Sequence, residues 1–226
     1  MFLFDPTFIL IIPVLILSFY AQSKVKNSYN KFNKVKSSTN LTGAEAAEKI
    51  LNRNGVSNIT IKKIGGTLTD HFDPRSNVVS LSEEVYNKST VSSLSIAAHE
   101  IGHVLQHQTD YTPIKIRSAI LPVASFGSKA AFPLFLIGFL FQTRFLMDLG
   151  IIFFAGALLF HLVTLPVEFN ASHRAYSELS NGILVRENEL RGTKKVLNAA
   201  ALTYVASTLM ALVQLLRLII LRGYRE

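Results

Sequence analysis

The sequence predicts an α+β membrane protein that is mostly helical, with about four transmembrane helices and a small cytosolic module carrying a short β-sheet. Nearly half of the 226 residues are hydrophobic and the mean hydropathy is +0.33, which is too apolar for an ordinary soluble domain. Several apolar segments are long enough to cross a bilayer. After the first of them comes a polar segment with short alternating stretches that are typical of strands.

The apolar segments divide the chain into five parts. The predicted parts are an N-terminal transmembrane anchor (1–21), a cytosolic module (22–117), a transmembrane hairpin (118–167), a cytosolic return segment (168–195) and a C-terminal transmembrane helix with a basic tail (196–226). Most lysines and arginines fall in the second and fourth parts, so the positive-inside rule places these parts in the cytosol. Because no positive charge precedes the first apolar segment, we expect an uncleaved anchor there.

The cytosolic module is expected to begin with a helix over Thr42–Arg53, which Asn54-Gly55 would end. Three strands should follow, and a turn at 73–76 should join the second to the third. These strands are predicted over Val56–Ile64, Thr67–Phe72 and Asn77–Leu81. The third strand is either the sheet edge to which an extended peptide could add, or a strand that is covered on both sides.

The charge and the cysteine content exclude some classes of function. A net charge of +8 could suggest nucleic-acid binding, but the chain has no basic-aromatic motif and its charges flank apolar segments. We therefore expect the lipid bilayer, and not nucleic acid, as a partner. The chain has no cysteine, so any metal must be bound by histidine and carboxylate side chains.

The most specific pattern is H-E-x-x-H, formed by His99, Glu100 and His103. On a helix, residues four apart share one face, so the two imidazoles can bind one ion while Glu100 reaches a water on it. We expect Ser92 or Ser93 to cap this helix.

A catalytic zinc usually has a third protein ligand. His107 continues the series of histidines, but it lies one further turn, or about 6 Å, along the helix, so we interpret it as a surface or supporting residue. Glu168 follows the third apolar segment directly and is expected on the same side of the membrane as His99. A carboxylate there would complete a His/His/Glu set.

Four stretches resemble the bacterial neutral zinc metallopeptidases of the YugP type, a family of membrane proteases. They are 68–74, 97–103, 165–172 and 197–204. The resemblance implies a zincin-like module of gluzincin type, with one Zn²⁺ per chain on His99, His103 and Glu168, and with Glu100 catalytic. More distantly similar membrane zinc endopeptidases have an Asp four residues after the ligand Glu, where this chain has Ser172.

Peptide hydrolysis also needs a group that stabilises the oxyanion of the transition state. The candidates are polar side chains near the predicted ligands: His71, Asn170, His173, Arg174 and Tyr176. Among them we favour His71, because it lies in a family-like stretch, and Arg174.

These observations predict a zinc metalloendopeptidase of the bacterial plasma membrane. It would hydrolyse protein or peptide substrates near the cytosolic membrane face, with a preference for membrane-proximal segments. Three alternatives stay open: a catalytically silent zinc-binding scaffold, a membrane interaction protein without metal, and a membrane-tethered nucleic-acid binder.

Overall fold

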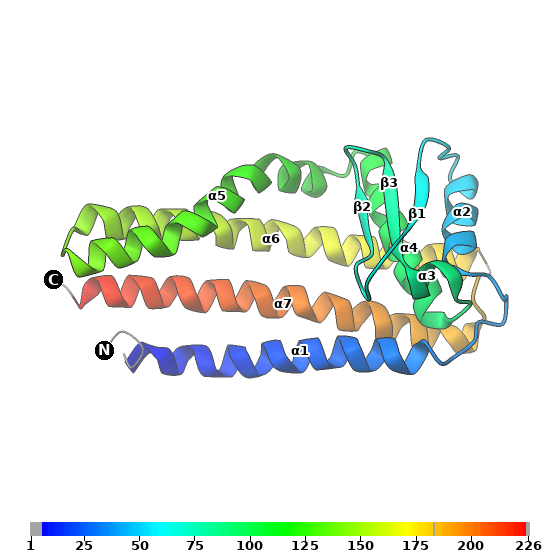
Figure 1. The fold of residues 1–226 in the computed structure, drawn as a ribbon, viewed down its shortest axis with the longest axis horizontal. Helices are drawn as coiled ribbons and strands as arrows, with labels where there is room; N and C mark the ends of the chain where they lie inside the picture. The colour runs from blue at the N-terminus through cyan, green and yellow to red at the C-terminus, as the bar shows by residue number, and fades with distance from the viewer. Residues whose placement is uncertain (1–5, 183, 225–226) are drawn as a thin grey trace. The chain divides into compact units, whose positions relative to one another are not determined.

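The computed structural model describes residues 6–182 and 184–224 and consists mostly of helices, with one small sheet (Figure 1). The elements, in chain order, are η2 (Pro6–Leu10), α1 (Ile11–Phe32), α2 (Gly43–Arg53), β1 (Thr60–Ile64), β2 (His71–Asp73), β3 (Val78–Ser82), α3 (Glu83–Asn87), α4 (Val91–Gln108), α5 (Thr112–Leu140), α6 (Arg144–Asn181) and α7 (Glu187–Gly223). This architecture confirms the predicted fold class.

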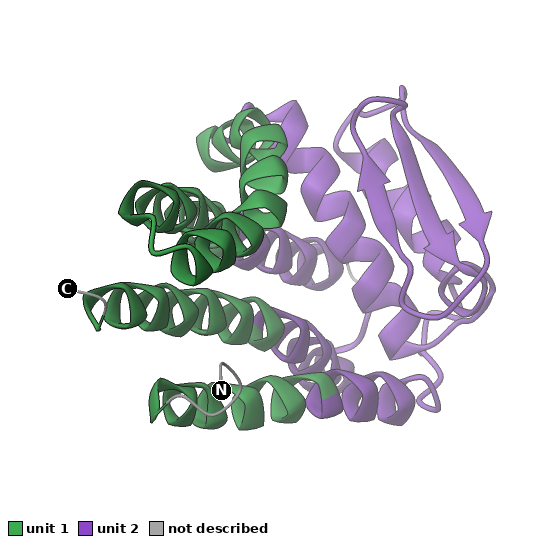
Figure 2. Cartoon of the chain, turned by 60° about the vertical axis from the view of Figure 1, so that its left-hand side comes forward, with its two compact units in different colours: residues 1–22, 112–166, 202–226 green, residues 23–111, 167–201 purple. Residues whose placement is uncertain are grey.

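The chain forms two compact units, which Figure 2 distinguishes by colour. The first unit contains residues 1–22, 112–166 and 202–226, and the second contains residues 23–111 and 167–201. Helices α1, α6 and α7 therefore each contribute residues to both units.

Four helices are long and apolar enough to cross a membrane, as predicted. They are Pro6–Phe32, Thr112–Leu140, Arg144–Asn181 and Glu187–Gly223. In the first unit, Phe135 of α5 and Met147 of α6 form a buried cluster with Leu218 and Leu221 of α7. The first helix extends further than the apolar pattern alone suggests, because the mostly polar segment from Lys24 to Phe32 continues it without a break.

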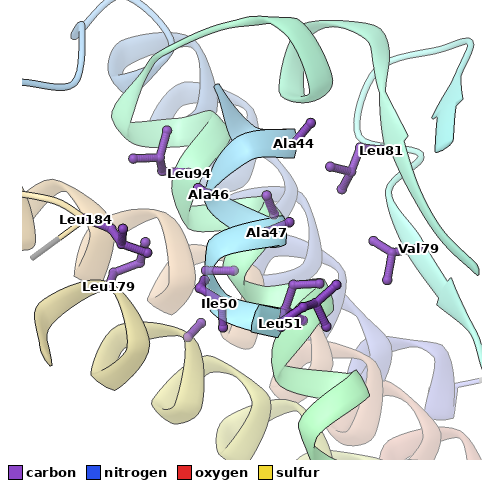
Figure 3. Packing of buried hydrophobic residues seen from close by; sticks show 14 of the residues in the cluster. Ala44, Ala46, Ala47, Ile50, Leu51, Val79, Leu81, Leu94, Leu179 and Leu184 are labelled. Carbon is purple, nitrogen blue, oxygen red and sulfur yellow. The ribbon is translucent and has the colours of Figure 1, made fainter. Parts of the chain in front are cut away.

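In the second unit, α2 packs against α4 and against the sheet. Thr42 caps α2 with a complete capping box, in which Thr42 Oγ1 accepts from the Glu45 backbone and the Glu45 carboxylate accepts from the Thr42 backbone. Figure 3 shows Val79 and Leu81 pointing from β3 towards this helix, and both side chains are fully buried. The predicted helix and its stop at Asn54-Gly55 are thus present.

The sheet has the strand order β1-β3-β2, with β1 parallel and β2 antiparallel to β3. The prediction that Asn77–Leu81 forms the sheet edge is therefore wrong, because β3 is the central strand. Ser80 and Ser82, on the face opposite Val79 and Leu81, are also buried, so both faces of β3 are covered. The alternation of residue types does not reveal strand neighbours, which is why the sequence left both readings open.

The start of the H-E-x-x-H helix also differs from the prediction. Thr90 is the N-cap of α4, and its Oγ1 accepts a hydrogen bond of 3.1 Å from the Ser93 backbone. Ser92 and Ser93 lie inside the first turn and are fully buried. Thr90 has the extended backbone that is typical of an N-cap, whereas Ser92 and Ser93 already belong to the helix.

Candidate zinc site

A close approach of two helices in the second unit forms the site. A Cβ atom on Gly102 of α4 would lie 2.5 Å from the carbonyl oxygen of Ala171 on α6, which is far inside van der Waals contact. Only glycine at this position allows the two backbones to come so near. Gly102 lies between Glu100 and His103, so this contact fixes the face of α4 that meets Glu168.

The structure brings His99, His103 and Glu168 together. Glu168 Oε2 lies 3.3 Å from His99 Nε2 and 3.6 Å from His103 Nε2, and one ligand atom of each residue lies within 4.8 Å of the others. The imidazole rings meet edge to face with their centroids 4.9 Å apart. Glu168 is only 2% exposed. A carboxylate so deeply buried is costly unless positive charge compensates it.

These three residues fit zinc. Tetrahedral zinc with ligand distances near 2.1 Å places neighbouring donor atoms about 3.4 Å apart. The two measured separations, 3.3 and 3.6 Å, bracket that value. Two imidazoles and one carboxylate are also the ligand set of a catalytic site that keeps its fourth position open. Both the chemistry of the donor atoms and their spacing are therefore suited to a zinc ion.

Hydrogen bonds orient the His103 ring. Gln106 is fully buried, and its side-chain NH₂ donates to the Val167 carbonyl oxygen at 2.7 Å and to Asn170 Oδ1 at 3.0 Å. Because its amide nitrogen is thus engaged, Gln106 presents Oε1 to His103 Nδ1 at 3.0 Å. His103 Nδ1 then donates, which leaves the Nε2 lone pair facing Glu168.

Sequence reasoning missed Gln106. Its spacing of three residues from His103 places it on the same face of the helix, and this spacing was the available signal. Its partners on α6 could not be foreseen, because Val167 and Asn170 lie more than sixty positions away in the chain.

Ser172 supports the other histidine. Its hydroxyl lies 3.3 Å from His99 Nδ1. The residue at this position carries a neutral hydroxyl and not a carboxylate. The imidazole is therefore oriented by a weaker partner than a carboxylate would be.

Negative charge gathers around the two histidines. Glu100 is 8% exposed, and its charge acts on both Asp70 and His103. Burial raises the pKa of Asp70, and the Glu100 charge adds to this effect, against two hydrogen bonds from Ser82. Burial alone would lower the pKa of His103, but the Glu168 and Glu100 carboxylates raise it overall. The surroundings thus favour a cation at this point.

The two favoured oxyanion candidates lie in different settings. His71 is exposed on β2, and its Nδ1 lies 2.9 Å from the Thr69 carbonyl oxygen. Arg174 donates to Asn170 Oδ1 at 2.8 Å and to Thr109 Oγ1 at 3.1 Å. Neither side chain belongs to the group of three metal-ligand candidates.

The remaining candidates have surroundings of their own. His107 lies outside the three-residue group and packs edge to face on Phe72, with centroids 5.5 Å apart. Asn170 is held between Gln106 and Arg174, whereas His173 and Tyr176 line a pocket on another face of α6.

Comparison with known proteins agrees with this geometry. Residues 7–223 match the family described as "Putative neutral zinc metallopeptidase". The chain belongs to this family. It is also 49% identical, over 212 residues, to a protein of Bacillus subtilis (strain 168) named "Putative membrane protease YugP", with 94% of each chain covered. No solved structure matches the chain.

Membership of the neutral zinc metallopeptidases confirms the resemblance found in the sequence and the prediction of a zinc-dependent peptide hydrolase. The group formed by His99, His103 and Glu168 is consistent with the zinc site of such an enzyme.

The helix contact leads to a test of the site. Replacing Gly102 with Ala should push α4 and α6 apart, because the added methyl group would meet the Ala171 carbonyl. Overpacking of this kind costs about 1–3 kcal/mol. We expect a lower melting temperature and less zinc per purified chain, measured by elemental analysis.

The matched control is Gly156→Ala, also in a helix, where an added Cβ would meet nothing within 4 Å. This variant should keep both properties. A Gly102→Ala protein with full zinc content and an unchanged melting temperature would contradict the proposed role of the contact.

Proposed function

We propose that this protein is a membrane-embedded zinc endopeptidase that cleaves protein or peptide substrates near the cytosolic membrane face. One observation carries the proposal: two histidines of one helix meet a buried glutamate of another, with Glu100 between the histidines in sequence. One zinc ion per chain would be held by His99, His103 and Glu168.

Zinc held by these three residues would act as a Lewis acid on the scissile carbonyl group and would lower the pKa of a water molecule to about 7. Glu100 acts as the general base: its carboxylate takes a proton from the attacking water and passes it to the leaving amine. Glu100 suits this role because it points from the same helix as the histidines, is not itself one of the three grouped ligands, and lies in a largely enclosed position.

His71 and Arg174 are the residues that we assign to stabilising the oxyanion. Both side chains carry hydrogen-bond donors. Arg174 also contacts Asn170, which accepts from Gln106, and Gln106 in turn contacts His103. Through this series of hydrogen bonds, Arg174 can position the ligand histidine as well as act on substrate.

The membrane location follows from the sequence around the ligands. Glu168 comes two residues after Pro166, in a helix that is apolar enough to cross a bilayer. The positive charges of 22–117 and 168–195 favour the cytosolic side for both segments that supply ligands. We therefore infer that substrates are cleaved close to the bilayer, where membrane-proximal segments are available.

The first test separates zinc binding from catalysis. Glu100→Gln removes the base but leaves the three proposed ligands intact, so zinc content should stay at the wild-type level. Cleavage of a mixed peptide library should fall by a factor of about 100 or more. A variant that cleaves as fast as the wild type would exclude Glu100 as the base, and a function that survives without cleavage would favour a zinc-binding scaffold.

The second test concerns the third ligand. Glu168→Ala removes one of three proposed ligands and leaves an open site, so zinc content measured after dialysis should fall clearly below one per chain. Glu48→Ala is the control, because Glu48 is an exposed glutamate on α2, remote in sequence from the ligands. Full zinc content in a folded Glu168→Ala protein would mean that the third ligand lies elsewhere.

A further inference from the structure

A pocket of about 320 Å³ opens beside the proposed zinc site, between the parts of α6 and α7 that belong to the second unit. Ser172 lines this pocket, and its hydroxyl also lies 3.3 Å from His99 Nδ1. A peptide whose scissile bond lies at the site could therefore place a nearby group in this pocket.

Four polar side chains that line the pocket carry hydrogen-bond donors. His173 and Tyr176 come from α6, and Lys194 and Asn198 come from α7. No acidic residue lines the pocket. Within residues 6–182 and 184–224, none of these four side chains makes a hydrogen bond or ion pair. Their donors, including the Lys194 ammonium, are therefore available to a ligand.

The same two helices also give the pocket an apolar lining. Phe169, Leu197 and Ala201 supply hydrophobic surface, and the ring of Tyr176 packs against the core of the unit. A ligand with an apolar stem and an acceptor group at its tip would suit this lining, because the Lys194 ammonium can only donate. A purely aliphatic side chain would bury the polar groups of the pocket without giving them hydrogen-bond partners. A cationic side chain would be repelled by the Lys194 ammonium.

We propose that this pocket is a substrate subsite that binds a carboxylate of the peptide through Lys194. The carboxylate belongs either to a glutamate side chain near the scissile bond or to the C-terminus of the peptide. The methylene groups of the stem lie on Phe169 and Leu197, and the carboxylate accepts from the Lys194 ammonium. This inference rests on the proposed peptidase function, because it assigns the pocket to the same substrate.

The test measures binding in the full-length Glu100→Gln protein in detergent, where peptides are not expected to turn over. Labelled peptides that differ only by Glu, Gln or Lys at one position near the scissile bond are compared by fluorescence anisotropy. Each is made with a free and with an amidated C-terminus. Because Lys194 is exposed, we expect about five-fold tighter binding of the carboxylate-bearing peptide than of its neutral counterpart.

Charge reversal gives the decisive comparison. Lys194→Glu in the same background should abolish this preference and favour the Lys peptide instead. The control is Lys195→Glu, which changes the net charge equally at an exposed neighbouring position that does not line the pocket. Lys194→Met should remove the preference without reversing it.

An unchanged preference in Lys194→Glu, or an equal change in Lys195→Glu, would overturn the subsite. Loss of the preference on amidation alone assigns the carboxylate to the C-terminus, and its persistence assigns it to the side chain. If the peptides bind with this preference but the wild-type protein cleaves none of them, the peptidase proposal fails, and Lys194 is left as a carboxylate-binding residue without a role in cleavage.

Discussion

The contact between Gly102 and the Ala171 carbonyl is the constraint on which the candidate site depends. The absence of a side chain on Gly102 lets α4 and α6 approach until their backbones touch. Glu168 lies one helical turn before the contact on α6, which is why its carboxylate reaches both histidines. Gln106 of α4 also donates directly to Val167 and Asn170 of α6, and Ser172 of α6 contacts the His99 imidazole, so the same two helices are tied together at two further points.

This arrangement makes the site a product of tertiary packing. The helix with both histidines and the segment with Glu168 are separated by residues 112–166, which belong to the other compact unit. The second unit is therefore complete only when residues 167–201 join residues 23–111. A fragment that ends before α6 would keep the H-E-x-x-H pattern but lack Glu168, Asn170 and Ser172, and with them the groups that hold the ligands in place.

Local patterns were the predictable part of this molecule. The stop of α2 at Asn54-Gly55, a turn between β2 and β3 (predicted at 73–76, observed at 74–77) and the helical spacing of His99 and His103 each involve residues within four positions of one another. Interactions between residues that are close in sequence largely determine such features. The chemistry of Glu168 and its place after an apolar segment were enough to nominate it as a ligand.

Features that depend on distant neighbours were not predictable. Strand β3 is central because β1 and β2 both pair with it, and nothing in residues 78–82 records those partners. The bond between Gln106 and the Val167 carbonyl and the pocket that joins His173 and Tyr176 to Lys194 also require the packed fold. The sequence alone identifies the polar residues but does not determine which of them are in contact in the folded chain.

Zinc X-ray absorption spectroscopy on the purified full-length protein tests the central claim most directly, because it counts the imidazoles bound to the metal. The packing of α4 against α6 predicts two imidazole nitrogens, with oxygen donors completing the shell at about 2.0–2.2 Å. A spectrum that requires three imidazoles would contradict the account, because a further histidine would then replace Glu168 as the third ligand.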